Sequence, residues 1–124
     1  MNNQEITVMY SWKAKDGKGE ELKENYRNVT KDMQETEPNA IKVDCSFDST
    51  NGTLAVYDLF KDGAALGQHL GTTAAGHFPT LLQIATPGTF FFCGDVPEEL
   101  KAAIIGMGLD AVFAPHMTGF DRRA

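Results

Sequence analysis

The sequence predicts an α+β fold of the ferredoxin-like kind, a β-α-β-β-α-β sandwich with a four-stranded antiparallel sheet. Three observations predict it. Four short runs alternate as strands do, helical periodicity separates the first run from the second and the third from the fourth, and a tight Asn51–Gly52 turn joins the middle two. The 124 residues, 42% of them hydrophobic, are enough for one such domain with a packed core.

The first strand and the first helix are separated by a change of periodicity near residue 15. Over residues 5–12 one strand face carries Ile6, Val8, Tyr10 and Trp12. After a polar turn at residues 15–19, the apolar positions take helical spacing at Leu22, Tyr26, Val29 and Met33. We expect this helix to end before Pro38, because the residue before a proline avoids helical geometry.

The two middle strands form a hairpin. Residues 40–48 alternate strictly, with Ile41, Val43, Cys45 and Phe47 on one face. The Asn51–Gly52 pair then returns the chain into residues 53–60, so the two strands are antiparallel neighbours.

A second helical region and a fourth strand complete the minimal unit. Asp62 is suited to cap a short helix, Gly71 interrupts it, and Thr73 is expected to cap a second helical segment. Pro87–Gly88 ends that segment and begins the fourth strand, residues 89–93.

The fourth strand carries three consecutive phenylalanines, Phe90–Phe92, so both of its faces are expected to be covered. Helices cover only one face of a ferredoxin-like sheet, and an apolar strand is unfavourable in water. We therefore expect a homodimer in which the open sheet faces of two copies pack together.

The chain continues beyond the minimal unit. We divide it into a ferredoxin-like domain at residues 1–94 and a C-terminal helix and tail at residues 95–124, packed on the same domain or on the partner subunit. Pro97 suits the first turn of this helix, and residues 111–114 are expected to form a short extra strand. A tail with apolar anchors leaves a purely structural role in assembly open.

Composition excludes several classes of partner. The net charge of −6 and the pI near 4.9 argue against nucleic acid, which needs a basic stripe. The sequence has no signal-peptide pattern at its start and no apolar run long enough to cross a membrane, so we expect a cytoplasmic protein without membrane contact. Cys45 and Cys93, far apart in strand-like runs, are expected to be small buried side chains rather than a redox pair.

Several segments resemble the antibiotic biosynthesis monooxygenase family. They are a glycine turn and charged helix (KDGKGEELKENYRNV), the strand EPNAIKVDCSFD, the segment LAVYDLFKDGAALGQHL, and GHF before a leucine-rich stretch. The match runs from about Ile6 to Cys93 and rests on the order and spacing of these pieces. The resemblance implies a dimeric α/β barrel with one pocket per subunit, between the sheet and the helices.

The resemblance also implies an activity. Members that are enzymes oxygenate phenolic or quinol-like aromatic substrates with dioxygen and without flavin, haem or metal, while others degrade haem or act as isomerases. This chain departs from the pocket pattern of the haem-degrading and quinol-oxygenating members. Trp12 is its only tryptophan, and the core of the first strand has no asparagine. A non-oxygenase of the same fold, either an isomerase-like enzyme or a small-ligand-binding protein, therefore stays open beside a cofactor-independent monooxygenase.

Two histidines are the candidate catalytic bases for deprotonating a phenol. His69 and His77 lie in the helical region that should cover the pocket, and a histidine titrates near neutral pH. Each could instead cap a helix or bond a carbonyl.

Four aromatic residues are the candidate substrate-binding residues, with core packing as the alternative for each: Trp12, Tyr57, Tyr26 and Phe78. Asp58 shares a strand face with apolar residues, so its burial would require a partner such as lysine or arginine. No HxH, HxxxH or CxxC spacing occurs, and we predict neither a metal site nor a cofactor.

Overall fold

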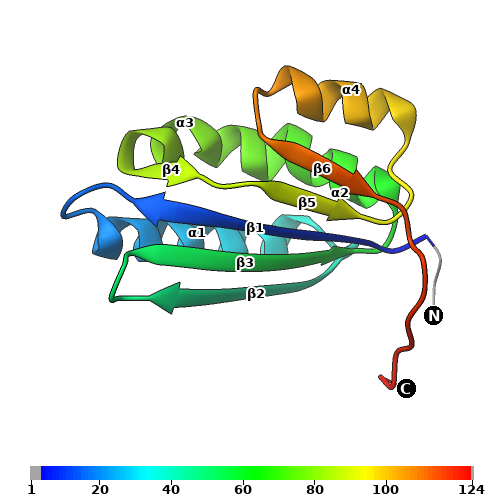
Figure 1. The fold of residues 1–124 in the computed structure, drawn as a ribbon, viewed down its shortest axis with the longest axis horizontal. Coiled ribbons are helices and arrows are strands. Elements are labelled where there is room, and N and C mark those ends of the chain that lie inside the picture. The colour runs from blue at the N-terminus through cyan, green and yellow to red at the C-terminus, as the bar shows by residue number, and fades with distance from the viewer. Residues whose placement is uncertain (1–3, 124) are drawn as a thin grey trace.

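The computed structural model describes residues 4–123 (Figure 1). Six strands form one sheet: β1 (Ile6–Ala14), β2 (Ala40–Asp48), β3 (Thr53–Phe60), β4 (Ala85–Pro87), β5 (Phe90–Cys93) and β6 (Ala111–Ala114). The helices are α1 (Gly19–Thr36), α2 (Gly63–His69), α3 (Ala75–Ile84) and α4 (Glu98–Gly106), with the π-helical turn η1 (Leu70–Ala74) joining α2 to α3. The predicted ferredoxin-like α+β fold is confirmed.

The sheet has the order β2-β3-β1-β5-β6, with β4 beside the far end of β1. The β1–β3, β2–β3 and β1–β5 pairs are antiparallel, as predicted, whereas β6 adds to β5 in parallel. The expectation of four strands is therefore wrong in number. The predicted fourth strand is β5, and the extra strand β4 precedes it at the end of the segment predicted to be helical. Pro87 ends β4 because proline has no N–H for the ladder, and the predicted C-terminal strand extends the sheet edge as β6.

The helices form one layer against the sheet (Figure 1). The charged helix α1 buries its predicted apolar stripe of Leu22, Tyr26, Val29 and Met33. Asp62 caps α2 as predicted, since its side chain accepts a 2.9 Å hydrogen bond from the Ala65 N–H. The predicted interruption at Gly71 is a change of helical pitch rather than a break, because η1 carries the chain from α2 directly into α3.

The core lies between the sheet and the helices. Its largest fully buried side chains include Trp12, Phe60, Phe92 and Leu22, together with Ile104 from α4. The opposite face of the sheet has no helical layer, and large apolar side chains on it are exposed. The expectation that both cysteines are buried is wrong: Cys45 is exposed, since β2 is an edge strand, and Cys93 is partly buried.

Within residues 4–123, none of the helices combines the length and the apolar character that crossing a bilayer requires.

Candidate active site

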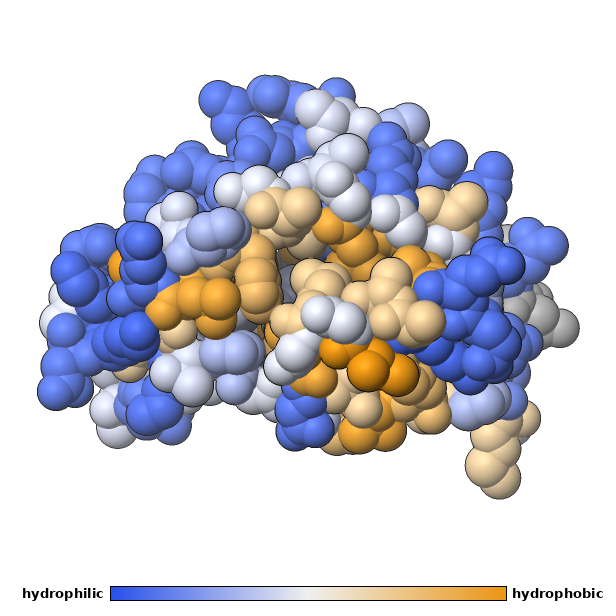
Figure 2. Space-filling view, turned by 90° about the horizontal axis from the view of Figure 1, so that it is seen from above, coloured by the Kyte–Doolittle hydropathy of each residue, from blue (hydrophilic) through white to orange (hydrophobic). Residues whose placement is uncertain are grey.

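A cavity lies between the sheet and the α2–η1–α3 segment. It encloses about 50 Å³, and most of its lining is aromatic or aliphatic. The lining residues are Val8, Tyr10, Trp12, Tyr26, Val29, Asp58, Phe60, Leu66, His69, Leu70, Ala74, His77, Phe78, Leu81, Phe90, Phe92, Met107 and Leu109. Seen from above the molecule, hydrophobic residues surround a hollow near the middle of the surface, with hydrophilic residues toward both ends (Figure 2).

One polar group of the cavity is a histidine held by a buried glutamate. The Nδ1 atom of His69 lies 3.0 Å from Oε2 of Glu37, and the Thr73 hydroxyl donates to the same oxygen at 2.5 Å. All three side chains are buried, with Glu37 and His69 only 3% and 6% exposed. The carboxylate fixes the imidazole as the tautomer with its proton on Nδ1, so Nε2, which has no hydrogen bond to the described residues, is available as a base.

The local sequence explains how this dyad forms. Glu37 follows the last residue of α1, where the helix dipole disfavours an acid, so its burial there depends on partners from another element. Those partners lie four residues apart, with His69 ending α2 and Thr73 inside η1. The π-helical turn, a feature often found at functional sites, begins directly after His69 and contains Thr73, so both side chains lie beside Glu37 at the end of α1.

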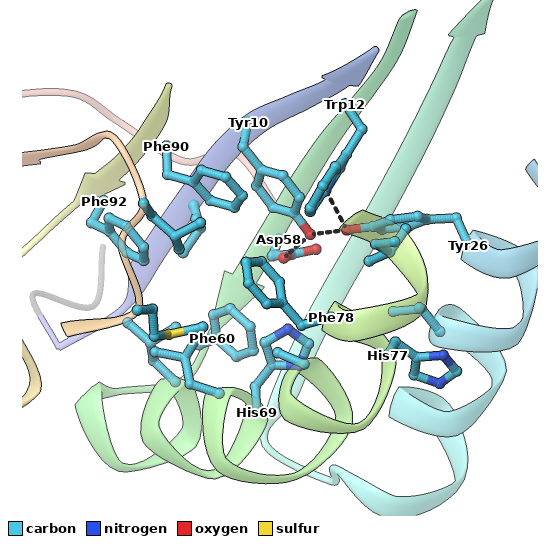
Figure 3. A pocket seen from close by; sticks show the side chains of 18 residues that line it. Tyr10, Trp12, Tyr26, Asp58, Phe60, His69, His77, Phe78, Phe90 and Phe92 are labelled. Carbon is cyan, nitrogen blue, oxygen red and sulfur yellow. Dashed lines mark hydrogen bonds between the residues drawn. The ribbon is translucent and has the colours of Figure 1, made fainter. Parts of the chain in front are cut away.

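The second polar group is a chain of hydrogen bonds that ends on Asp58 (Figure 3). The Trp12 indole N–H donates to the Tyr26 hydroxyl at 3.2 Å, and the Tyr26 hydroxyl donates to the Tyr10 hydroxyl at 2.9 Å. The Tyr10 hydroxyl donates to Oδ2 of Asp58 at 3.1 Å. The other carboxyl oxygen, Oδ1, is buried and has no partner among the described residues. The expectation that a lysine or arginine would pair with Asp58 is therefore wrong.

Burial raises the pKa of each acid in this chain. Desolvation raises the pKa of Asp58 from 3.8 to about 6, against the opposing effects of the nearby His69 and of the hydrogen bond from Tyr10. Desolvation is also the largest cause that raises the pKa of Tyr10 and of Tyr26 well above that of an ordinary phenol. Because Oδ2 of Asp58 accepts from Tyr10, the proton of the neutral carboxyl belongs on Oδ1, where it can be donated.

Five of the six residues predicted for the site line this cavity: His69, His77, Trp12, Tyr26 and Phe78. His77 differs from His69, because its Nε2 atom lies 2.7 Å from Oδ2 of Asp32 on α1 and its ring points away from the other labelled side chains (Figure 3). Tyr57 does not reach the cavity. Its neighbour Asp58 points inward, and successive residues of a strand face opposite sides of the sheet.

Sequence reasoning missed Glu37 and Thr73 and favoured a structural role for Asp58 over one that orients a histidine. The one available signal for Glu37 was an acid at a helix C-terminus, which is electrostatically unfavourable without a partner. Reasoning from the sequence also left the C-terminal extension without a place in the site. Met107 and Leu109, at the end of α4 and just beyond it, line one end of the cavity.

Residues 4–123 contain no cluster of three or more histidine, cysteine or acidic side chains that could hold a metal ion.

The fold has counterparts among solved structures, although no family model and no curated protein matches the chain. MupZ from Pseudomonas fluorescens superposes with a TM-score of 0.81 at 18% identity, over 98% of this chain and 97% of MupZ. SnoaB, a cofactor-independent oxygenase from Streptomyces nogalater, superposes with a TM-score of 0.62 at 12% identity, over 72% of this chain and 90% of SnoaB. A Caulobacter crescentus protein described as an antibiotic biosynthesis monooxygenase superposes with a TM-score of 0.61 at 20% identity, over 77% of this chain and 93% of that protein.

These likenesses show the fold. The chain has the α+β fold of the antibiotic biosynthesis monooxygenases, as its sequence resemblance predicted, and it shares almost its whole length with MupZ, including the C-terminal extension.

Proposed function

We propose that this protein is a cofactor-independent monooxygenase that oxidises a small aromatic, phenol- or quinol-like substrate, with His69 as the base. The observation that carries the proposal is the buried Glu37–His69 pair beside a partly open, aromatic-lined cavity. The fold it shares with SnoaB, a cofactor-independent oxygenase, supports the same interpretation.

The dyad begins the reaction by removing a proton. Nε2 of His69 takes the phenolic proton, and the Glu37 carboxylate stabilises the imidazolium that forms. Thr73 holds the carboxylate in place through its hydroxyl. The phenolate, in a cavity with little water, is then electron-rich enough to reduce dioxygen itself.

The oxygen chemistry balances without an external reductant. The phenolate gives one electron to dioxygen, and the two radicals combine to form a C–O bond and a peroxide anion. The imidazolium of His69 returns its proton to the peroxide. Loss of the C–H proton at the same carbon then breaks the O–O bond, so phenol plus dioxygen becomes quinone plus water. Below its pKa of about 6, the Asp58 carboxyl is protonated and can donate from Oδ1 to the oxygen that bears negative charge in these steps.

Isomerisation by proton transfer is the second candidate, and one observation favours it. The cavity holds a base, His69, and a proton donor, Asp58, which together could move a proton within an enolisable carbonyl compound without oxygen. His69 would remove a proton from the carbon beside the carbonyl, Asp58 would donate to the carbonyl oxygen, and the proton would return at another carbon.

Oxygen uptake distinguishes the two candidates. With a panel of simple quinols and phenols, we expect oxygen consumption that falls at least a hundredfold in His69→Gln, whose amide can still donate to Glu37, and in His69→Ala. His116→Ala, on the exposed tail, is the control and should keep the wild-type rate. Uptake that is unchanged in both His69 variants would remove the dyad from the mechanism. Proton–deuterium exchange into a ketone under nitrogen, with no oxygen uptake on any quinol, would favour the isomerase.

We also propose that the protein is a homodimer formed by the uncovered sheet face. Tyr57, Met9, Phe91 and Val112 are cross-strand neighbours on β3, β1, β5 and β6, and they form an apolar row across that face. Met9, Phe91 and Val112 are 43%, 42% and 40% exposed in the single chain, which is unfavourable for adjacent large apolar side chains in water.

The mass in solution tests the dimer. Phe91→Asp places a charge in the row, and light scattering after gel filtration should report a monomer for this variant and a dimer for the wild type. Leu82→Asp on α3 is the matched control, since Leu82 is equally exposed (42%) but lies on the helical side, and it should remain dimeric. A wild type that runs as a monomer at every concentration would exclude this interface.

A further inference from the structure

The cavity is small. A cavity needs about 10–15 Å³ to hold one water molecule, and an engineered cavity of about 150 Å³ binds benzene. The space of about 50 Å³ between Trp12, His69 and Phe78 is a third of the latter, so a single aromatic ring fits only if a side chain moves. A second fused ring would require still larger displacement of the lining side chains.

Phe78 and Met107 are lining side chains that can yield, whereas the sheet-side core is fixed. Trp12, Phe60 and Phe92 belong to the sheet-side core and are at most 1% exposed, so close packing holds them. Phe78 on α3 and Met107 after α4 are only partly buried. The Phe78 ring lies edge-on to Trp12 with centroids 5.9 Å apart, and an unbranched methionine adapts readily. Movement of either side chain would therefore enlarge the cavity for a ligand.

The charges around the cavity disfavour an anion. No lysine or arginine is among the described residues that line it, whereas Asp58 faces the space and Glu37 lies directly behind His69. The two histidines that line the cavity are each already paired with a carboxylate, His69 with Glu37 and His77 with Asp32. A carboxylate or phosphate on the ligand would lose its hydration and meet negative charge, which is costly at low dielectric.

We infer that the cavity selects uncharged molecules of one ring that carry hydroxyl or carbonyl oxygens, and that Phe78 and Met107 set the size limit. The oxygens would meet Nε2 of His69 and the Asp58 carboxyl, while the ring lies among the aromatic side chains. The inference names the substrate class of the proposed function and rests on it for the identity of the site, but binding can be measured without turnover.

The test is anaerobic binding of three related probes, followed by calorimetry and by the fluorescence of Trp12, which lines the cavity and is the only tryptophan of the chain. Hydroquinone has one ring and no charge, naphthohydroquinone has two rings, and gentisate is hydroquinone with a carboxylate. We expect hydroquinone to bind at least tenfold more tightly than either of the other two. Equal or tighter binding of naphthohydroquinone or gentisate, or no binding of hydroquinone, would overturn the inference.

Variants then separate size from charge. Phe78→Ala should strengthen naphthohydroquinone binding at least tenfold and leave gentisate weak. Phe78→Leu, a smaller perturbation of the fold, should shift the preference in the same direction by a smaller factor. Leu82→Ala, on the same helix but outside the cavity, is the control and should change neither preference. Unchanged size selection in both Phe78 variants, with native circular dichroism, would remove this residue from the size limit.

The two proposals fail in different ways. Hydroquinone that binds without being oxidised would leave the inferred ligand class standing and remove the monooxygenase. Rapid oxygen uptake on a two-ring or carboxylated quinol would keep the monooxygenase and overturn the inferred class.

Discussion

Replacing Asp58 with asparagine tests whether this buried carboxyl is held in its neutral form. The side chain is 2% exposed, and burial raises its pKa from 3.8 to about 6. The groups that face it are Tyr10 on β1, Tyr26 on α1, His69 on α2 and Glu37 beyond the end of α1. An asparagine at this position would keep an oxygen for the Tyr10 hydroxyl but could not titrate, so Asp58→Asn isolates the proton.

The sign of the effect follows from linkage. The native state binds the Asp58 proton more tightly than the unfolded state does, because the folded pKa is the higher one. The stability that this residue contributes is therefore fully present below about pH 4 and is lost as the pH rises through about 6. At roughly 1.4 kcal/mol for each unit of pKa, the loss amounts to about 3 kcal/mol.

Urea unfolding of wild type and variant between about pH 4 and pH 7.5 measures this loss, at one protein concentration so that any dimerisation cancels. The wild-type free energy of unfolding, minus that of Asp58→Asn, should fall by about 2 to 3 kcal/mol from the acidic to the neutral end. Titrating groups that do not interact with Asp58 cancel in this difference. A difference that stays constant within about 0.5 kcal/mol would refute the raised pKa. Asp44→Asn, at an exposed position on β2, is the control.

Three further changes test the fold and the dyad. Gly94 has φ +129°, and a Cβ there would lie 2.8 Å from a neighbouring backbone oxygen, so Gly94→Ala should lower the free energy of unfolding in urea by about 1–3 kcal/mol. Gly106→Ala, where a Cβ would meet open space, should not show this loss. Ile104→Ala should cost about 2–5 kcal/mol because the side chain is fully buried, whereas exposed Ile105→Ala should stay within about 0.5 kcal/mol. Thr73→Val should cost about 1–3 kcal/mol and lower kcat, since the buried glutamate loses a donor; unchanged stability and kcat would make that hydrogen bond irrelevant.

Local periodicity in the sequence predicted most of the strands and helices of the fold. Alternation along β1 put Tyr10 and Trp12 on the same face as the core, and helical spacing placed Tyr26 on the buried stripe of α1. Three of the four members of the hydrogen-bond chain are thus determined by side-chain period alone. Asp58 has the same period, but its protonation depends on how completely the helices exclude water, which no local pattern encodes.

The dyad depends on tertiary contact. Glu37 lies 32 residues from His69 and 36 from Thr73, and only the packing of η1 against the end of α1 brings their side chains together. The same packing turns His77 toward Asp32 and separates it in role from His69, although both histidines are near neighbours in sequence.

The sequence by itself determined the ferredoxin-like order of elements, the helix stripe, the Asp62 cap and an apolar sheet that needs a cover, because each follows from spacing along one segment. Only the tertiary structure decided which histidine is paired with a buried carboxylate and that Asp58 has a tyrosine and no cation as its partner among the described residues. It alone also placed Tyr57 on the open face and the C-terminal extension at one end of the cavity. The physical reason is that periodicity fixes the face a side chain occupies, whereas its partner and the dielectric around it are set by elements distant in sequence.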